Sequence, residues 1–256
     1  MQSAILDNHK HISYEDLGSG KPVIFIHPPG MGRHVFYHQR KLSEKMRVIL
    51  PDLSGHGDSS RINVNDVSVR YYSEELIEFL DNLKIEKAVF CGYSAGGAIA
   101  QYISSHHPER LNGIILFGGY PAVLNLTLRL EHKIGMYMVK NHRSMLTKML
   151  AISHTKNQGY QQLLISHMNK AQGGAWYKYY HEVLNINLRN DIKRIDIPLL
   201  LMYGTKSDSI NQYHSFFKAR TSQHRIVFIK HSSHQIPTKR WNVANEEISQ
   251  FILRLD

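Results

Sequence analysis

A serine enclosed by small residues stands directly after an apolar run, in the segment Gly92-Tyr93-Ser94-Ala95-Gly96. Small residues at 92 and 96 let a serine take a strained turn, because a larger side chain there would clash with the flanking strand or helix. Such a turn exposes the hydroxyl above a helix N-terminus, where backbone N–H groups can stabilise an oxyanion. The segment therefore predicts a nucleophilic serine, and a Gly-Ser turn without chemistry is the alternative.

A serine hydroxyl is a weak nucleophile, so this chemistry needs a base and a third group that orients the base. Asp208 follows an apolar run at 197–203, and His234 follows a second run at 225–229. Catalytic groups of open parallel sheets gather at the carboxyl ends of the strands. The order Ser94, Asp208, His234 along the chain is typical of a triad built on such a sheet.

The elements that must position these residues alternate between short apolar strands and amphipathic helices. Predicted strands lie at 23–26, 48–50, 88–91, 113–117, 197–203 and 225–229. Predicted helices of the same pattern lie at 73–83 and 241–255. This alternation indicates an α/β fold with a mostly parallel central sheet flanked by helices.

The alternation is interrupted between residues 121 and 190. Helical patterns rich in methionine and aromatic residues occupy this stretch, at 135–149, 159–171 and 176–188, without a clear strand between them. We therefore expect one core formed by residues 1–120 and 191–256, with residues 121–190 inserted as a helical cap. Methionines 136, 138, 145, 149 and 168 and the aromatic residues 176, 177, 179 and 180 either line a substrate pocket or pack a core.

Composition fits a globular domain, with 42% hydrophobic and 20% charged residues in a chain of 256. The single cysteine, Cys91, excludes an internal disulfide and is expected to be a buried small hydrophobe. The first 14 residues are polar, and no apolar run is long enough to span a bilayer. We therefore expect a cytoplasmic location and no transmembrane segment.

The formal net charge of +10 is concentrated in the middle of the chain. Residues 121–190 hold nine Lys and Arg against two Asp and Glu, whereas residues 1–120 hold 12 against 13. Basic runs interleaved with aromatic residues are missing there, so nucleic-acid binding is not predicted. A solvated basic face is the plain interpretation, and attraction of anionic substrates or lipid surfaces is the other.

Four motifs together resemble the α/β-hydrolase family over essentially the whole chain. They are Ile26-His27 with the Pro/Gly-rich loop after it, the segment Asp52-Leu53-Ser54-Gly55-His56-Gly57-Asp58-Ser59, the serine turn, and Gly204 to Asp208 combined with His234. The resemblance implies that Ser94 is the nucleophile, that His234 is the general base and then acid, and that Asp208 orients it. It implies no cofactor.

Other titratable residues near these motifs are weaker candidates. His231 stands where similar proteins have a glycine, and Asp191 and Asp196 precede the strand rather than follow it. His34 and His38 have no carboxylate or cysteine cluster beside them, so no metal site is expected.

The oxyanion hole departs from the pattern of similar hydrolases, which take one N–H from the residue after the nucleophile and one from the loop after the first strand. Ala95 supplies the first, but Pro29 occupies the position of the second donor, and proline has no N–H. Either Gly30 or Met31 donates from a shifted loop, which we favour, or the protein is a weak hydrolase or has another task. Phe36, Tyr37 and Tyr93 are expected to contact substrate.

The sequence thus predicts a serine hydrolase that cleaves a small or medium-sized ester or related acyl compound through an acyl-enzyme on Ser94. Carbon–carbon bond hydrolysis, lactone hydrolysis and peroxyacid formation on the same triad are alternatives, because the fold does not fix the chemistry. A slow-turnover ligand-binding or signalling protein is a further alternative. The expected partner is a small molecule, and the sequence does not indicate the oligomeric state.

Overall fold

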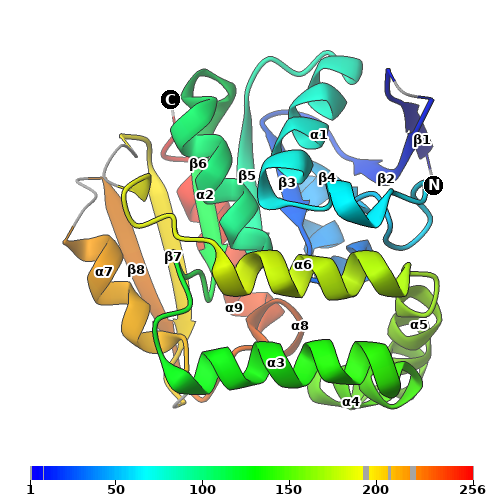
Figure 1. The fold of residues 1–256 in the computed structure, drawn as a ribbon. Coiled ribbons are helices and arrows are strands. Elements are labelled where there is room, and N and C mark those ends of the chain that lie inside the picture. Colours follow the sequence, from blue (N-terminus) through cyan, green and yellow to red (C-terminus); the bar gives the residue numbers. More distant parts are fainter. Residues whose placement is uncertain (1, 8, 193–195, 207–208, 220–222, 256) are drawn as a thin grey trace.

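The computed structural model describes residues 2–7, 9–192, 196–206, 209–219 and 223–255. Within them the chain forms an eight-stranded sheet with the order β1-β2-β4-β3-β5-β6-β7-β8 (Figure 1). The strands are β1 (Gln2–Ile5), β2 (His11–Leu17), β3 (Pro22–Ile26), β4 (Arg47–Pro51), β5 (Ala88–Tyr93), β6 (Leu111–Phe117), β7 (Leu199–Gly204) and β8 (His224–Ile229). Only the pairs β1–β2 and β2–β4 are antiparallel.

All six predicted strands are present, and the predicted α/β class with a mostly parallel sheet is confirmed. The sequence analysis missed β1 and β2 at the antiparallel edge. These two strands carry polar residues such as Gln2, His11 and Glu15, and several of their side chains face solvent. A half-solvated antiparallel edge lacks the continuous apolar run by which buried parallel strands are found.

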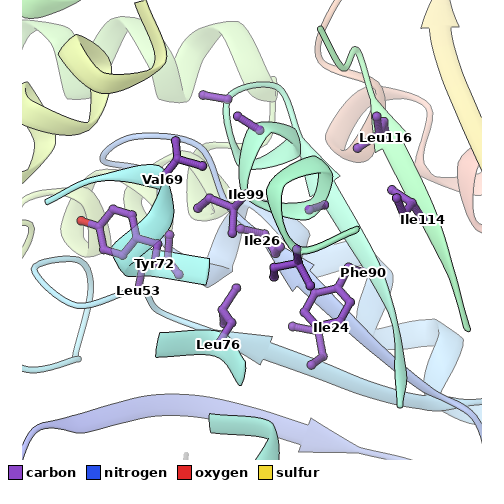
Figure 2. Close-up of a cluster of buried hydrophobic side chains, with 14 of the residues drawn as sticks. Ile24, Ile26, Leu53, Val69, Tyr72, Leu76, Phe90, Ile99, Ile114 and Leu116 are labelled. Carbon is purple, nitrogen blue, oxygen red and sulfur yellow. The ribbon is translucent and has the colours of Figure 1, made fainter. Parts of the chain in front are cut away.

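Side chains from the parallel strands point alternately to the two faces of the sheet and build two cores. On one face, Ile24, Phe90 and Ile114 pack against α1 (Val69–Asn82) and α2 (Gly96–His106), as Figure 2 shows. On the other face, the alternate residues of the same strands pack against the 3-10 segment η1 (Arg33–Glu44) and α9 (Trp241–Ile252). Helices on both faces hold the central strands rigidly, with β5 and β7 buried along their whole length.

In the described part of the stretch between β6 and β7, four α-helices sit together at one end of the molecule (Figure 1). They are α3 (Leu126–Asn141), α4 (Arg143–His154), α5 (Gln158–Met168) and α6 (Gly173–Asn185), and we call them the cap. A single antiparallel bridge between Ala122 and Asn187 joins the two ends of this segment.

The predicted helix at 135–149 is two helices, which corrects the sequence analysis. His142 leaves the helical region, with φ −141° and ψ 41°, and separates α3 from α4. Periodicity missed the break because apolar residues recur at helical spacing on both sides of it. Within the described ranges, no helix is long and apolar enough to cross a membrane.

Candidate active site

Ser94 stands in the tight turn between β5, which ends at Tyr93, and α2, which begins at Gly96. Its backbone takes the left-handed conformation, with φ +53°. A Cβ at Gly92 would lie 2.5 Å from Gly97 Cα, and one at Gly96 would overlap the Ile26 carbonyl. Only glycine fits at both positions, so the small residues that flagged this segment are required by close backbone packing.

His234 follows β8 and lines the same cavity of about 400 Å³ as Ser94 and Ala95. Its imidazole packs on the Tyr93 ring, with 5.1 Å between the ring centroids. On another side it lies against Gly118, where a Cβ would come within 2.7 Å of the ring. Gly118 at the end of β6 therefore makes room for His234, a role that the sequence analysis did not foresee.

The other acid and base candidates lie either outside the described residues or away from the cavity. Asp208 lies outside the described residues, so its position relative to His234 is not part of the structure. His231 is exposed, and its backbone N–H donates to Thr205 Oγ1 over 3.0 Å. Neither His231 nor Asp191 nor Asp196 lines the cavity.

The loop after β3 forms a tight turn across Pro28, Pro29, Gly30 and Met31. Met31 N–H donates to the Pro28 carbonyl over 3.2 Å, and Gly30 has φ +77°. Proline followed by a glycine with positive φ is the sequence of a type II turn. The Met31 N–H is therefore engaged inside the turn and is a poor oxyanion donor.

Two backbone donors near this turn stay available. Ala95 N–H and Gly30 N–H donate to no acceptor within the described part of the chain. Ala95 and Pro29 line the cavity, whereas Gly30 packs so tightly beneath the Trp176 ring of α6 that a Cβ there would overlap it. Gly30 and Met31 are the two candidates to replace the donor lost at Pro29. Of these two, Gly30 is the one whose N–H donates to no acceptor in the described structure.

A buried hydrogen-bonded pair, Tyr120 and His132, lines the same cavity as Ser94. His132 Nδ1 lies 2.8 Å from the Leu128 carbonyl, which can only accept, so Nε2 accepts the Tyr120 hydroxyl over 3.0 Å. Burial raises the pKa of Tyr120 well above 10. Burial also lowers the pKa of His132 below 6.5. The pair is therefore neutral and joins the loop after β6 to helix α3.

Sequence reasoning did not single out Tyr120 or His132. The available signal was the position of Tyr120, which follows Gly118 and Gly119 at the carboxyl end of β6, on the sheet edge where ligands gather. His132 gave no signal, because a lone histidine on a helix is common.

Apolar side chains from the core and the cap form most of the cavity wall. They are Pro28, Pro29, Met31, Leu128, Ile134, Met138, Met145, Leu146, Met149, Leu150 and Ile210. Of the aromatic residues around it, Tyr93, Tyr120 and Tyr180 line the cavity. A wall of this composition suits an apolar ligand with one polar end.

Several residues expected at the pocket are not brought to it. Phe36 is fully buried, with its ring 5.2 Å from Phe25 and 6.5 Å from Tyr93, so it packs the core behind the cavity. Tyr37 packs on Tyr160, outside the lining. The remaining expected residues that do not line the cavity are Met136, Met168, Trp176, Tyr177 and Tyr179.

The segment from Asp52 to Ser59 holds the fold together rather than contributing to the cavity. Buried Asp52 forms an ion pair with Arg33 and lies 2.9 Å from His167 Nε2, while Asp58 pairs with Arg33 and with Lys170 of the cap. Oxygen and nitrogen atoms of Asp52, Asp58 and His167 lie close enough together to ligate a cation. Arg33 and Lys170 already supply positive charge there, so the chemistry of the cluster does not call for a metal.

His27 also has a structural role. Its Nδ1 donates to the Pro28 carbonyl over 3.0 Å, and its Nε2 accepts the Leu53 N–H over 3.0 Å. Burial lowers the pKa of His27 to about 4, so the ring is neutral and links the loops after β3 and β4.

The chain is similar in sequence to known hydrolases and in fold to solved ones. A family model described as alpha/beta hydrolase fold matches residues 21–140. The 2-hydroxymuconate semialdehyde hydrolase of Pseudomonas sp. (strain CF600) is 35% identical over 107 residues, covering 40% of this chain and 38% of that protein. The 3-oxoadipate enol-lactonase 2 of Acinetobacter baylyi is 25% identical over 255 residues, covering 96% and 94%.

Among solved structures, an esterase from Exiguobacterium antarcticum superposes with a TM-score of 0.88 at 20% identity, covering 98% of this chain and 99% of that one. This likeness shows a shared fold. The match to the first curated relative spans well under half of that protein's length.

Proposed function

We propose that this chain, which is similar to the alpha/beta hydrolase fold family over residues 21–140 and shares its fold with a solved esterase, is a serine hydrolase of small or medium-sized esters. The observation that carries the proposal is the left-handed backbone of Ser94, held between Gly92 and Gly96 at the edge of a cavity that also contains His234. Backbone strain of this kind is concentrated at functional sites.

In the proposed reaction, His234 takes the proton from the Ser94 hydroxyl while the oxygen attacks the carbonyl carbon of the substrate. The carbonyl oxygen then carries the negative charge, and the N–H groups of Ala95 and Gly30 stabilise it. Collapse of the intermediate expels the alcohol, which receives the proton from His234. Water then attacks the acyl-enzyme by the same route, and Asp208 is proposed to orient His234 in both steps.

The apolar wall supports a substrate whose acyl or alcohol part is a hydrocarbon chain or ring. The Tyr120 hydroxyl, the His132 imidazole and the Ser94 hydroxyl supply the polar end of the cavity. No cofactor or metal takes part in the proposed chemistry.

The test pairs a fluorophosphonate label with turnover of short p-nitrophenyl esters. Ser94→Ala should abolish both labelling and turnover, because the nucleophilic oxygen is lost. Ser153→Ala is the matched control, since it removes another hydroxyl of the same cavity and should keep both. Full activity of folded Ser94→Ala protein, checked by circular dichroism, would contradict the proposal.

Lactone hydrolysis and carbon–carbon bond hydrolysis are the alternatives suggested by the names of the relatives. Both reactions would use the same serine, so a panel of esters, enol-lactones and ring-cleavage products assayed side by side distinguishes them. A burst of product followed by near-zero steady turnover would instead support slow-turnover ligand binding, the outcome that Pro29 favours.

A further inference from the structure

Helix α3 exposes an apolar stripe to solvent. Leu126, Leu130, Ile134 and Tyr137 are between 52% and 83% exposed and recur at spacings of four, four and three, which places them on one side of the helix. Buried Leu128, His132 and Val139 occupy the opposite side. The helix is thus apolar on the side that faces the protein and on the side that faces away from it.

Helix α4 continues this apolar surface around the cavity. Met145, Met149 and Ile152 are 52–63% exposed, again at helical spacing. Ile134 of α3 and Met145 and Met149 of α4 also line the cavity that contains Ser94. Ile134, Met145 and Met149 are thus both exposed and part of the cavity wall, so the apolar surface of α3 and α4 adjoins the opening of the cavity.

Basic side chains flank the apolar residues on both helices. They are Arg129, Lys133, Lys140, Arg143 and Lys148, all exposed. None of the five forms an ion pair with a carboxylate of the described residues. The stretch 121–190 holds nine Lys and Arg against two Asp and Glu, and the pairs Lys170–Asp58 and Lys178–Glu182 involve none of these five residues.

We propose that this surface, formed by the exposed apolar and basic residues of α3 and α4, docks on a bilayer that contains anionic phospholipid. Apolar side chains flanked by Lys and Arg are the pattern of helices that lie in the membrane interface. Each Lys or Arg near an anionic surface contributes about 1 kcal/mol of attraction. Because the cavity opens within this surface, an apolar substrate would pass from the lipid to Ser94 without crossing water; this last step rests on the proposed function.

A second copy of the chain fits this surface less well. A two-fold contact brings the same patch of both subunits together, which would set the unneutralised basic residues of one copy against those of the other. The charge therefore favours an anionic partner.

The test measures binding to vesicles of phosphatidylcholine with and without phosphatidylglycerol, by cosedimentation. The protein should bind the anionic vesicles and be released by salt, since screening weakens the attraction. The double variant Leu130→Glu/Ile152→Glu changes two exposed residues that do not line the cavity, and it should bind at least about tenfold more weakly. Leu253→Glu, at an 81% exposed residue near the end of α9, is the matched control and should bind as the unchanged protein does.

Four outcomes overturn the docking proposal. They are absence of vesicle binding at low salt, equal binding to purely zwitterionic vesicles, equal binding of the double variant, and a dimer that the double variant dissolves. Turnover of a water-soluble ester by the double variant checks that the site is intact. Ser94→Ala should still bind vesicles, so failure of the proposed activity and failure of docking are separable.

Discussion

Glu75 brings a carboxyl group into the core from helix α1, where it is only 4% exposed. One oxygen accepts the Ser54 N–H over 3.1 Å, and the other has no hydrogen-bond partner in the described structure. Burial raises the pKa of Glu75 to about 7, and the hydrogen bond from the Ser54 backbone N–H limits the rise. Through Ser54 the residue contacts the loop after β4, but it does not line the cavity.

We predict that Glu75→Gln removes a pH-dependent loss of stability. Since the pKa of Glu75 in the folded state lies above its ordinary value of 4.5, its contribution to stability is fully present below pH 4.5 and is lost as pH rises through about 7. The loss amounts to about 3 kcal/mol. Urea unfolding near pH 4.5 and above pH 7 should show the variant gaining stability over the unchanged protein only at the higher pH. An equal difference at both pH values would contradict this.

At the scale of elements, helix α5 is attached to the core through charge. His167 contacts Asp52, and Lys170, just beyond the helix, contacts Asp58 over 2.6 Å. Asp52 is fully buried, and Arg33 and His167 hold its pKa well below the usual range against the effect of burial. The attachment therefore joins the cap to the loop after β4 through a buried carboxylate.

We predict that His167→Ala loosens α5 more than the rest of the molecule. The variant leaves one oxygen of a buried carboxylate without its side-chain partner, at a cost of about 1–3 kcal/mol. Hydrogen exchange should speed up in α5 and stay unchanged in β5. Gln162→Ala, at an exposed residue of the same helix, is the control and should leave both rates unchanged. Uniform acceleration throughout the molecule would mean that the cap does not open by itself.

The elements differ in how far the sequence predicted them. The parallel strands were found because burial on both faces selects continuous apolar residues, as in β5 and β7. The break at His142 and the edge strands β1 and β2 were missed. A single change of backbone angle and a half-solvated surface leave only weak patterns in the sequence.

The residues of the candidate site also differ in how far the sequence predicted them. The serine turn was found because its glycines are required locally, whereas the Tyr120–His132 contact joins the loop after β6 to α3 and depends on tertiary packing. For the same reason, the burial of Phe36 could not be read from periodicity.

At the scale of the whole molecule, the 17 histidines are distributed unequally between surface and interior. His27, His56 and His154 are fully buried, in the loops after β3 and β4 and in the cap. Burial lowers the pKa of His27 to about 4 and the pKa values of His56 and His154 to about 3. Composition alone gave the number of histidines but not which of them are kept neutral.

We predict a steep loss of stability in acid. Since the pKa values of these three histidines in the folded state lie below 6.5, their contribution is intact above pH 6.5 and is lost as pH falls toward 4 and 3. On unfolding these three histidines take up three protons, which contributes about 4 kcal/mol per pH unit to the slope. His34, whose pKa burial also lowers to about 4, adds to the slope, and Glu75 partly offsets it down to pH 4.5. Urea unfolding at stepped pH measures the slope. His154→Phe should reduce the slope by about 1.4 kcal/mol per pH unit, the share of one proton, and His142→Gln, at an exposed residue, should not; an unchanged slope in His154→Phe would contradict the assignment.

The left-handed backbone conformation of Ser94 also affects which residue is favoured at position 94. A non-glycine residue in the left-handed region costs about 1–2 kcal/mol, whereas a glycine costs about 0.5–1 kcal/mol through the extra freedom of the unfolded chain. The other non-glycine residues with positive φ in the described chain, His9, Lys84 and His231, are exposed loop positions. At position 94, folding alone favours glycine, so a procedure that redesigns this chain for stability without regard to chemistry would remove the serine. Preference for serine there must come from reactivity, and optimising the fold and keeping the reaction are opposing demands on this one residue.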